Sequence, residues 1–325
     1  MKDFVIGVQC ESMGTRCGIW TYSARVIKYL NKLDNTKAVG FVKKYKNGKP
    51  NVINIQYEPG MLPPNKVMRL MNKYKEPIIM TAHHTLNLEQ FYPMVDGVIL
   101  HDEGQIVGEK PWDYCIIPHP ALVFPKKDKK KLRKKYNLPQ DKKIVGTMGF
   151  ICGTGKLLPY TVEEILKNLN DDEFLYLITS FWKGGDMGRL DEIKKVVKSL
   201  GKEDNFRIDT DFIVDEELLN EKMQCCNLLY AWNNVGKGSP GSQSGSAADM
   251  YGSRVKLIVK DCPHYSFIGN QDKVVVGREH PSEFAEDVIN LLREGNLDDI
   301  QDPTWLSWEE QIKKYKKYFE EVSEL

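Results

Sequence analysis

The stretch Leu228-Leu-Tyr-Ala-Trp-Asn-Asn-Val-Gly-Lys-Gly-Ser-Pro-Gly-Ser-Gln-Ser-Gly245 joins an apolar run to a loop rich in glycine and serine. A short helical pattern follows, and a second apolar run ends at Val259. This order is typical of an α/β sheet in which a helix N-terminus presents free backbone N–H groups to a phosphate. Ser242 and Ser244 are candidate N-caps of that helix. The stretch indicates a phosphorylated or nucleotide ligand, and a plain Gly/Ser turn without a ligand is the open alternative.

The whole chain has 325 residues, 41% of them hydrophobic, which is enough for two domains of ordinary size. Its net charge of +1 provides no global field that would attract nucleic acid. The seven cysteines are scattered without a repeated C-x2-C spacing, which favours reduced thiols in a cytoplasmic protein. Because no run of 18 apolar residues occurs, we expect a soluble protein or one peripheral to a membrane.

Apolar runs alternate with helical patterns along the chain, which predicts parallel sheets covered by helices on both faces. The expected strands of the first half are Phe4–Gln9, Val52–Gln56, Ile78–Thr81, Gly97–Leu100 and Tyr114–Ile117. Those of the second half are Lys143–Phe150, Phe174–Ser180, Asn205–Asp209, Asn227–Trp232, Val255–Val259 and Lys273–Val276. The expected helices are Ile19–Leu33, Tyr160–Leu169, Leu190–Leu200, Asp215–Gln224 and Pro281–Arg293. The prediction is an α/β protein with two doubly wound domains and a cleft between them.

A basic run over residues 124–136, with eight lysines and arginines, separates the two halves and is the expected domain junction. We therefore expect an N-terminal domain over residues 1–125 and a C-terminal domain over residues 140–300. The basic run can contact an anionic membrane or nucleic acid, and the solvated face of a linker helix is the alternative.

The C-terminal tail over residues 302–322 reads as an amphipathic helix. Its apolar stripe consists of Trp305, Trp308, Ile312, Tyr315 and Phe319. A stripe with this spacing is typical of a helix that packs on a core.

Polar loops follow several strands of the first half, where the carboxyl ends of parallel strands bind ligands. Arg16 follows the first strand and can pair with a phosphate. Gln56 and Glu58 can hydrogen bond to sugar hydroxyls, although Glu58 can also simply cap a turn. His83 ends another strand and can act as a general base near neutral pH. Its neighbour His84 points elsewhere on an extended chain, so we expect only one of the two in the cleft.

Another glycine-rich loop, Gly149-Phe-Ile-Cys-Gly-Thr-Gly-Lys156, opens the second half, and Lys156 is suited to neutralising a diphosphate. This loop lacks the GxxxxGK[ST] spacing of a P-loop, and the loop after the first strand lacks the GxGxxG spacing, which disfavours a dinucleotide there. His101 and His119 also end strands, but no HxH or HExxH arrangement supports a metal site.

Five segments in this order resemble the landmarks of GT-B glycosyltransferases, and the chain is most similar to the family 4-like group. They are Arg16-Cys-Gly-Ile-Trp-Thr-Tyr22, Ile55-Gln-Tyr-Glu-Pro-Gly60, Ile79-Met-Thr-Ala-His83, Ile117-Pro-His119 and Ser242-Gln-Ser-Gly245. The resemblance covers the whole chain and includes a Trp308-Glu309 pair that opens the last helix.

This resemblance implies two Rossmann-like domains, with a nucleotide-sugar donor held by the C-terminal one and an acceptor by the N-terminal one. By position, His83 matches the family's cleft histidine, which acts as a base or as an orienting group. Gly18 matches a glycine near the donor phosphates. Ser244 and Gly245 match the phosphate-contacting helix start, with Ser242 and Ser246 beside them. The resemblance also implies that residues 304–325 pack back on the N-terminal domain.

Two departures from the family pattern affect the donor site. Many members carry a glutamate that binds the donor ribose, and Ala247 falls at its position, with Asp249 as the nearest acid. The family's arginine and lysine after the first strand of the second domain fall near Cys152 and Gly155. The arginine is absent, and Lys156 lies one residue away.

The resemblance implies a hexosyltransferase-type enzyme that moves a sugar from a nucleoside-diphosphate sugar to an acceptor hydroxyl. We expect no cofactor and no metal, because protein groups neutralise the diphosphate. The acceptor is open among a glycan, a lipid, a protein, a metabolite and a modified nucleic acid, with peripheral membrane contact as a further expectation. The alternatives are a catalytically silent sugar- or nucleotide-binding protein of the same fold and a GT-B nucleotide-sugar epimerase.

Overall fold

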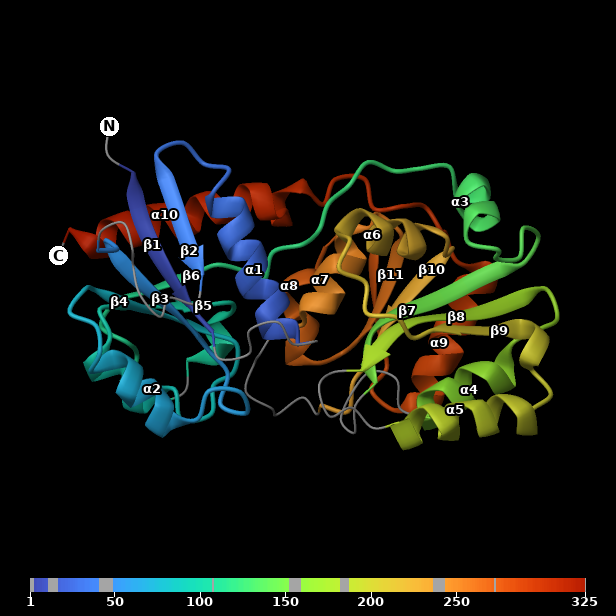
Figure 1. Ribbon diagram of the computed structural model, residues 1–325. Coiled ribbons are helices and arrows are strands. Elements are labelled where there is room, and N and C mark those ends of the chain that lie inside the picture. The colour runs from blue at the N-terminus through green and yellow to red at the C-terminus, as the bar shows by residue number, and fades with distance from the viewer. Residues whose placement is uncertain are drawn as a thin grey trace. The chain divides into compact units, whose positions relative to one another are not determined.

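The computed structural model describes residues 3–10, 17–40, 49–106, 108–151, 159–181, 187–235, 243–271 and 273–324. The chain divides into two compact units, which Figure 1 shows in ribbon form. The first unit comprises Met1–His119, Pro240–Gln243 and Trp308–Leu325, and the second comprises Pro120–Ser239 and Ser244–Ser307. The chain passes into the second unit at Pro120, so the basic run 124–136 lies inside that unit rather than between the two.

The first unit is built on a six-stranded parallel sheet with the order β2-β1-β3-β4-β5-β6. Its strands are β1 (Phe4–Gln9), β2 (Thr36–Gly40), β3 (Val52–Tyr57), β4 (Ile78–Ala82), β5 (Gly97–Leu100) and β6 (Tyr114–Ile116). The prediction of parallel strands is confirmed, but it lacked β2. This edge strand has only five residues and is partly exposed, so it gives no apolar run.

Helices cover both faces of the first sheet (Figure 1). On one face, α1 (Gly18–Leu30) packs against α10 (Trp308–Ser323), and the hydroxyl groups of Tyr22 and Tyr315 share a hydrogen bond. On the other face, α2 (Pro64–Met71) and the 3-10 helix η1 (Glu89–Met94) bury apolar side chains against β3, β4 and β5. Most of the predicted tail stripe is buried on α10, whereas Trp305 precedes this helix and is partly exposed.

The second unit repeats the plan with a six-stranded parallel sheet in the order β12-β11-β10-β7-β8-β9. Its strands are β7 (Lys143–Ile151), β8 (Glu173–Phe181), β9 (Phe206–Asp209), β10 (Leu228–Ala231), β11 (Lys256–Lys260) and β12 (Val274–Gly277). One face is covered by α4 (Pro159–Asn168), α5 (Met187–Ser199) and α9 (Pro281–Glu294). The other carries α3 (Lys129–Lys135), α6 (Glu216–Gln224), α7 (Gly245–Gly252) and α8 (Ser266–Gly269). The two doubly wound α/β sheets confirm the predicted fold class.

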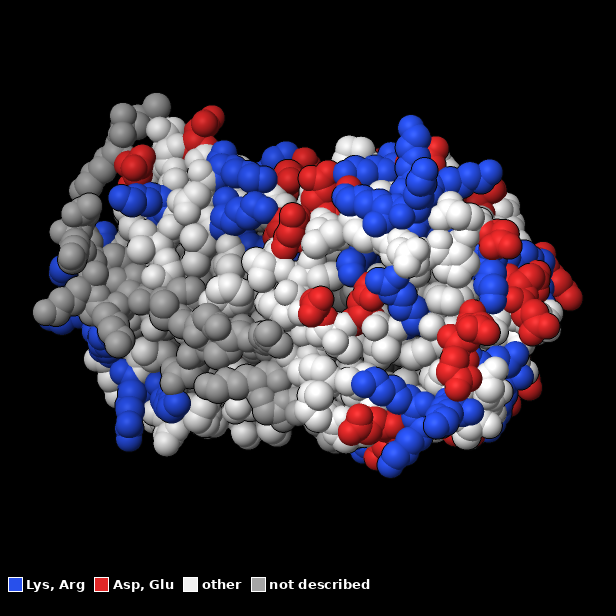
Figure 2. All heavy atoms as spheres, turned by 45° about the vertical axis from the view of Figure 1, so that its right-hand side comes forward, with Lys and Arg blue, Asp and Glu red and all other residues white. Residues whose placement is uncertain are grey.

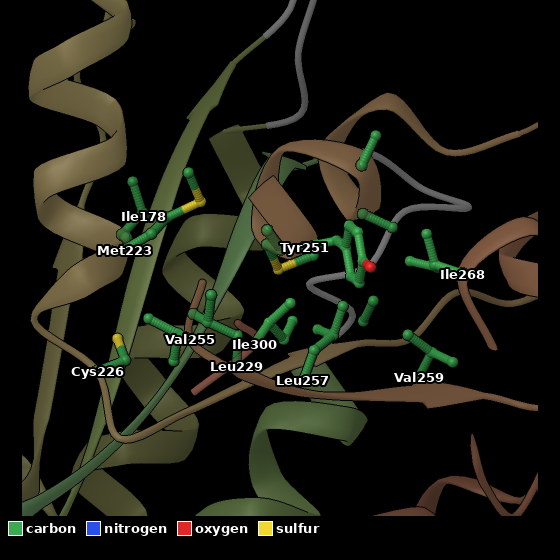
Figure 3. Close-up of a cluster of buried hydrophobic side chains, with 14 of the residues drawn as sticks. Ile178, Met223, Cys226, Leu229, Tyr251, Val255, Leu257, Val259, Ile268 and Ile300 are labelled. Carbon is green, nitrogen blue, oxygen red and sulfur yellow. The ribbon is translucent and has the colours of Figure 1, made fainter. Parts of the chain in front are cut away.

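The α7 face of the second sheet has a continuous apolar core, which Figure 3 shows in close-up. Met223 of α6 and Tyr251 of α7 pack there with strand residues such as Leu229 and Leu257. Gly252 ends α7 at a crowded point, because a Cβ at this position would overlap the carbonyl oxygen of Leu122.

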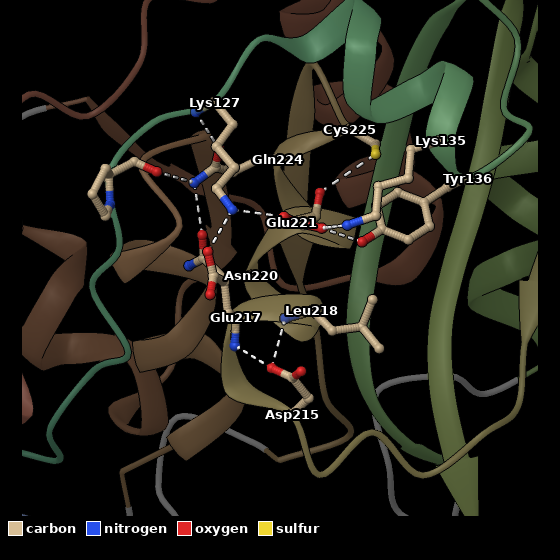
Figure 4. Close-up of polar contacts among 11 residues, drawn as sticks. Lys127, Lys135, Tyr136, Asp215, Glu217, Leu218, Asn220, Glu221, Gln224 and Cys225 are labelled. Carbon is tan, nitrogen blue, oxygen red and sulfur yellow. Dashed lines mark hydrogen bonds and ion pairs between the residues drawn. The ribbon is translucent and has the colours of Figure 1, made fainter.

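The basic run forms α3 and is held to α6 by a shared carboxylate (Figure 4). Glu221 accepts hydrogen bonds from Lys127 (2.6 Å), Lys135 (2.5 Å) and Tyr136. Burial of the Glu221 carboxylate raises its pKa, but the hydrogen bonds from these three donors outweigh that effect and lower the pKa to about 2. Arg133 is buried and donates to backbone carbonyls, among them that of Cys225. Several cations of the basic run therefore make hydrogen bonds within the second unit.

Charges of both signs are interspersed on the face that Figure 2 draws. Among the described residues, no helix is long and apolar enough to cross a membrane.

Candidate functional site

Three histidines lie together at the carboxyl edge of the first sheet. His83 follows β4 directly, His101 follows β5, and His119 comes shortly after β6. The ring centroids of His83 and His101 are 5.3 Å apart, and those of His101 and His119 are 5.4 Å apart. Tyr22 of α1 lies edge-on to them, with centroid distances of 4.6, 5.5 and 4.8 Å. Parallel strands thus bring residues 83, 101 and 119 into one cluster around a single tyrosine.

The cluster is supported from behind by the last helix. Tyr315 of α10 hydrogen bonds to the hydroxyl of Tyr22, and burial, together with the adjacent Tyr315 hydroxyl, raises the pKa of Tyr22. The Trp308 ring lies 5.0 Å from that of Tyr22 and stacks on Tyr29. The position of Tyr22 therefore depends on residues almost 300 positions away in the sequence.

A line of buried polar side chains leads from inside the sheet to His83. Nε2 of His83 lies 2.8 Å from Oε1 of Gln56. The Gln56 amide in turn donates to Asn54, and Nδ2 of Asn54 donates to Oγ1 of Thr81 at 2.9 Å. Asn54 and Thr81 are fully buried, and Gln56 is 1% exposed. Three polar side chains within apolar strands were the sequence signal for this arrangement, but only Gln56 was singled out.

The electrostatics of the cluster favour uncharged rings. Removal of the His83 ring from water lowers its pKa well below the usual value, and the neighbouring His101 and His119 add to this effect. Burial lowers the pKa of His101 to about 4, against a smaller opposing effect of its hydrogen bond to the Ile117 carbonyl. At neutral pH these imidazoles are therefore neutral, so they can accept a proton or a hydrogen bond.

Two other predicted residues of the first unit lie at the ends of its elements, Glu58 after β3 and Gly18 at the start of α1. Glu58 directly follows β3, and its carbonyl accepts from the backbone N–H groups of Met61 and Leu62 in a tight turn. Gly18 is the exposed first residue of α1, and the preceding N-cap Cys17 makes no side-chain capping bond. Arg16 lies outside the described residues.

In the second unit, the N-terminus of α7 is capped as predicted by Ser244. Its Oγ accepts from the backbone N–H of Ala247 at 3.2 Å and lies 3.3 Å from Oγ of Ser246. Gly245 is the first helical residue. Ser242 and Lys156 lie outside the described residues.

Beside this helix start, a buried lysine fixes the end of β10. Nζ of Lys260 donates to the backbone carbonyls of Asn233 (3.1 Å) and Val235 (2.8 Å), and it lies 5.0 Å from the Trp232 ring. Nδ2 of Asn233 donates to Nδ1 of His264 at 3.0 Å, and the carbonyl of His264 accepts from the N–H of Ser244. No sequence pattern distinguishes Lys260, because it reads as the end of an ordinary strand.

Ala247 and Asp249, which the sequence comparison set against the family's ribose-binding glutamate, both lie in α7. Ala247 is fully buried in the first turn of α7. Asp249 is also buried, and its carboxylate accepts from the backbone N–H of Leu122 at 3.0 Å. Asp249 is therefore engaged with the chain segment that enters the second unit. Among the described residues, no group of histidine, cysteine, aspartate and glutamate side chains is arranged to hold a metal ion.

The chain is similar to solved structures in fold. No protein-family model matches this sequence, and no curated protein matches it. HepE of Anabaena, solved in complex with UDP and glucose, matches with a TM-score of 0.65 and 10% identity over 99% of this chain and 97% of its own. Sucrose-phosphate synthase of Thermosynechococcus elongatus matches with a TM-score of 0.66 and 12% identity over 98% and 96% of the two chains. A glycosyltransferase of Rickettsia africae matches with a TM-score of 0.65 and 10% identity over 99% of both chains. The chain thus has the two-domain fold of the GT-B glycosyltransferases.

Proposed function

We propose that this protein is a glycosyltransferase that moves a sugar, of hexose type, from a nucleoside-diphosphate sugar to an acceptor hydroxyl. The observation that carries the proposal is His83, a neutral imidazole held at the carboxyl edge of the first sheet of a GT-B fold. Structures that match nearly the whole chain support the choice of donor, since HepE was solved with UDP and with UDP-glucose.

The donor diphosphate binds, in this proposal, at the start of α7 through Ser242, Ser244, Gly245 and Ser246. Free backbone N–H groups and the positive end of the helix dipole stabilise a departing anion there. Gly18 allows close approach of the N-terminus of α1, and Lys156 supplies a positive charge. With these groups in place, no metal and no cofactor is required.

The reaction then needs one group that receives a proton. The acceptor oxygen forms a bond to the anomeric carbon, and the bond from that carbon to the diphosphate oxygen breaks. The proton of the acceptor hydroxyl passes to His83 as general base. Arg16 and Glu58 bind the sugar or the acceptor in this proposal, whereas the buried Gln56 contacts His83 instead.

The acceptor is a glycan, a lipid, a protein, a metabolite or a modified nucleic acid. A cytoplasmic location and peripheral contact with a membrane stay predictions from the sequence.

A silent binding protein of the same fold is the second candidate. It is favoured by Ala247, which stands where many relatives carry a ribose-binding glutamate, and by the engagement of Asp249 with Leu122. Such a protein would bind a nucleotide sugar without turnover, whereas an epimerase of this fold would change the sugar without an acceptor.

Two measurements separate these candidates. A thermal-shift screen with UDP, GDP, ADP, CDP and TDP identifies the nucleotide, because a ligand that binds the folded state raises the melting temperature. Release of that nucleoside diphosphate from its sugar conjugates is then followed with and without added acceptors. Binding without turnover, with every common donor sugar, would favour the silent protein.

The role of His83 is tested with a matched neighbour. His83→Ala should lower turnover about 100-fold or more, since general-base groups contribute that much. His84→Ala is the control, because Nδ1 of His84 accepts only a local bond from the backbone N–H of Leu86. Full activity of His83→Ala would remove the catalytic role from His83.

A further inference from the structure

The hydrogen-bond chain behind His83 begins at a group whose polarity is fixed. The backbone carbonyl of Ile79 can only accept, and Nδ2 of Asn54 donates to it at 3.2 Å. The same nitrogen donates to Oγ1 of Thr81 at 2.9 Å. The Asn54 amide therefore has one orientation, with Oδ1 directed to Gln56.

This orientation passes to Gln56 and from there to His83. Oδ1 of Asn54 accepts from Nε2 of Gln56, so Oε1 of Gln56 is the atom that faces His83. An amide oxygen has no hydrogen to give. The bond of 2.8 Å to Nε2 of His83 consequently requires that Nε2 carries the hydrogen.

We propose that Asn54 and Gln56 are positioning residues that lock His83 as its Nε2–H tautomer and make Nδ1 the atom that accepts the proton of the acceptor hydroxyl. The tautomer follows from the hydrogen-bond chain, and the catalytic part rests on the proposed glycosyl transfer. Among the described residues, none donates a hydrogen bond to Nδ1 of His83. Transfer of the proton to Nδ1 gives an imidazolium whose Nε2–H keeps its bond to Gln56.

Two further observations agree with a positioning role. Both ends of the Gln56 amide are already bonded, and the side chain is 1% exposed, so Gln56 acts through His83 rather than on a sugar. His101 is held as the opposite tautomer, because its Nδ1 lies 2.8 Å from the carbonyl of Ile117 and must donate to it. Two rings only 5.3 Å apart thus have different protonated nitrogens.

The tautomers can be measured directly in the full-length protein. Long-range ¹H–¹⁵N correlation spectra at pH 7.5, assigned with His83→Gln and His101→Gln variants, distinguish the two forms of each ring. We expect His83 to favour Nε2–H by about ten to one, the ratio that corresponds to a hydrogen bond of ordinary strength. His101 should show Nδ1–H as an internal reference. A wild-type spectrum with Nδ1–H as the main form of His83 would overturn the proposal without any variant.

Variants at Gln56 test the cause of this preference. Gln56→Leu removes the acceptor and should lower the tautomer ratio about threefold or more. Gln56→Glu keeps an acceptor, so it should preserve the Nε2–H form. Its negative charge should raise the pKa of His83 and move the acidic limb of the kcat/KM profile about one pH unit upward. Gln90→Leu is the matched control, because Gln90 is exposed and donates only to the nearby Asn87 carbonyl. An unchanged tautomer ratio in Gln56→Leu would refute the role of Gln56.

The spectra test the tautomer of His83, and the activity tests the proposed glycosyl transfer, so each can be rejected without the other. An Nε2–H tautomer in a protein without turnover would retain the hydrogen-bond chain and reject the proposed transfer. Turnover with His83 in the Nδ1–H form would retain the transfer and reject the chain. Turnover that depends on His83 but has a pH profile unmoved by Gln56→Glu would reject the positioning role.

Discussion

Burial of His101 makes the stability of the first unit depend on pH in a calculable way. Its pKa falls from 6.5 in the unfolded chain to about 4 in the fold, and its ring is only 1% exposed. Between these two values the unfolded state binds a proton that the folded state does not bind. The stabilisation is therefore complete above about pH 6.5 and is lost as the pH falls toward about 4.

The size of the effect follows from the two pKa values. The linkage relation gives a loss of about 2 kcal/mol from His101 alone between pH 7.5 and pH 5. His83 acts in the same direction, because its pKa is also lowered. Substitution His101→Asn removes the titrating group, so the variant should lose about 2 kcal/mol less than the wild type over this interval.

Urea unfolding at a series of pH values measures this difference, with hydrogen exchange of the peptide 97–106 reporting on the first unit. His280→Asn is the control, because His280 is exposed and its ring contacts the hydroxyl of the neighbouring Ser282. Its pH dependence should equal that of the wild type. Parallel stability curves for the wild type and His101→Asn would refute the reasoning.

Three further predictions concern the second unit. Gly252→Ala should destabilise this unit by about 2 kcal/mol, because the new Cβ meets the Leu122 carbonyl. The control Gly269→Ala, at the end of α8 with ordinary contacts, should change stability by less than about 0.5 kcal/mol. Equal melting temperatures for the two variants would contradict this prediction. Glu221→Gln should lower the free energy of unfolding by about 1–2 kcal/mol at low salt and by less at high salt, since it removes the charge that holds α3 to α6. Urea midpoints that differ from the wild type by the same amount at both salt concentrations would refute this prediction. Lys260→Met removes the donor to the buried carbonyl of Asn233 and the partly buried carbonyl of Val235, and it should cost about 2 kcal/mol in urea unfolding. An unchanged midpoint would show that the ammonium is dispensable.

The sequence by itself determined the architecture, because apolar runs and helical spacing are local properties. Eleven of the strands were placed within one or two residues, since strands covered on both faces read as continuous apolar runs. The edge strand β2 and the short helix α2 were missed, because partly exposed elements lack such a pattern. Ser244 was recognised as a cap because capping is also local, between a side chain and a backbone N–H three residues on.

Only the tertiary structure decided which polar residues work together. The polar residues of the hydrogen-bond chain belong to β3, β4 and the residue after β4, which become neighbours only when the sheet forms: Asn54, Gln56, Thr81 and His83. Tyr22 likewise hydrogen bonds to Tyr315, which lies near the other end of the sequence. The sequence marked His83 as a strand-end histidine, but it contained no sign of which ring nitrogen carries the hydrogen. That property depends on a hydrogen-bond chain anchored at the Ile79 carbonyl, and such a chain exists only when the strands pair in this register.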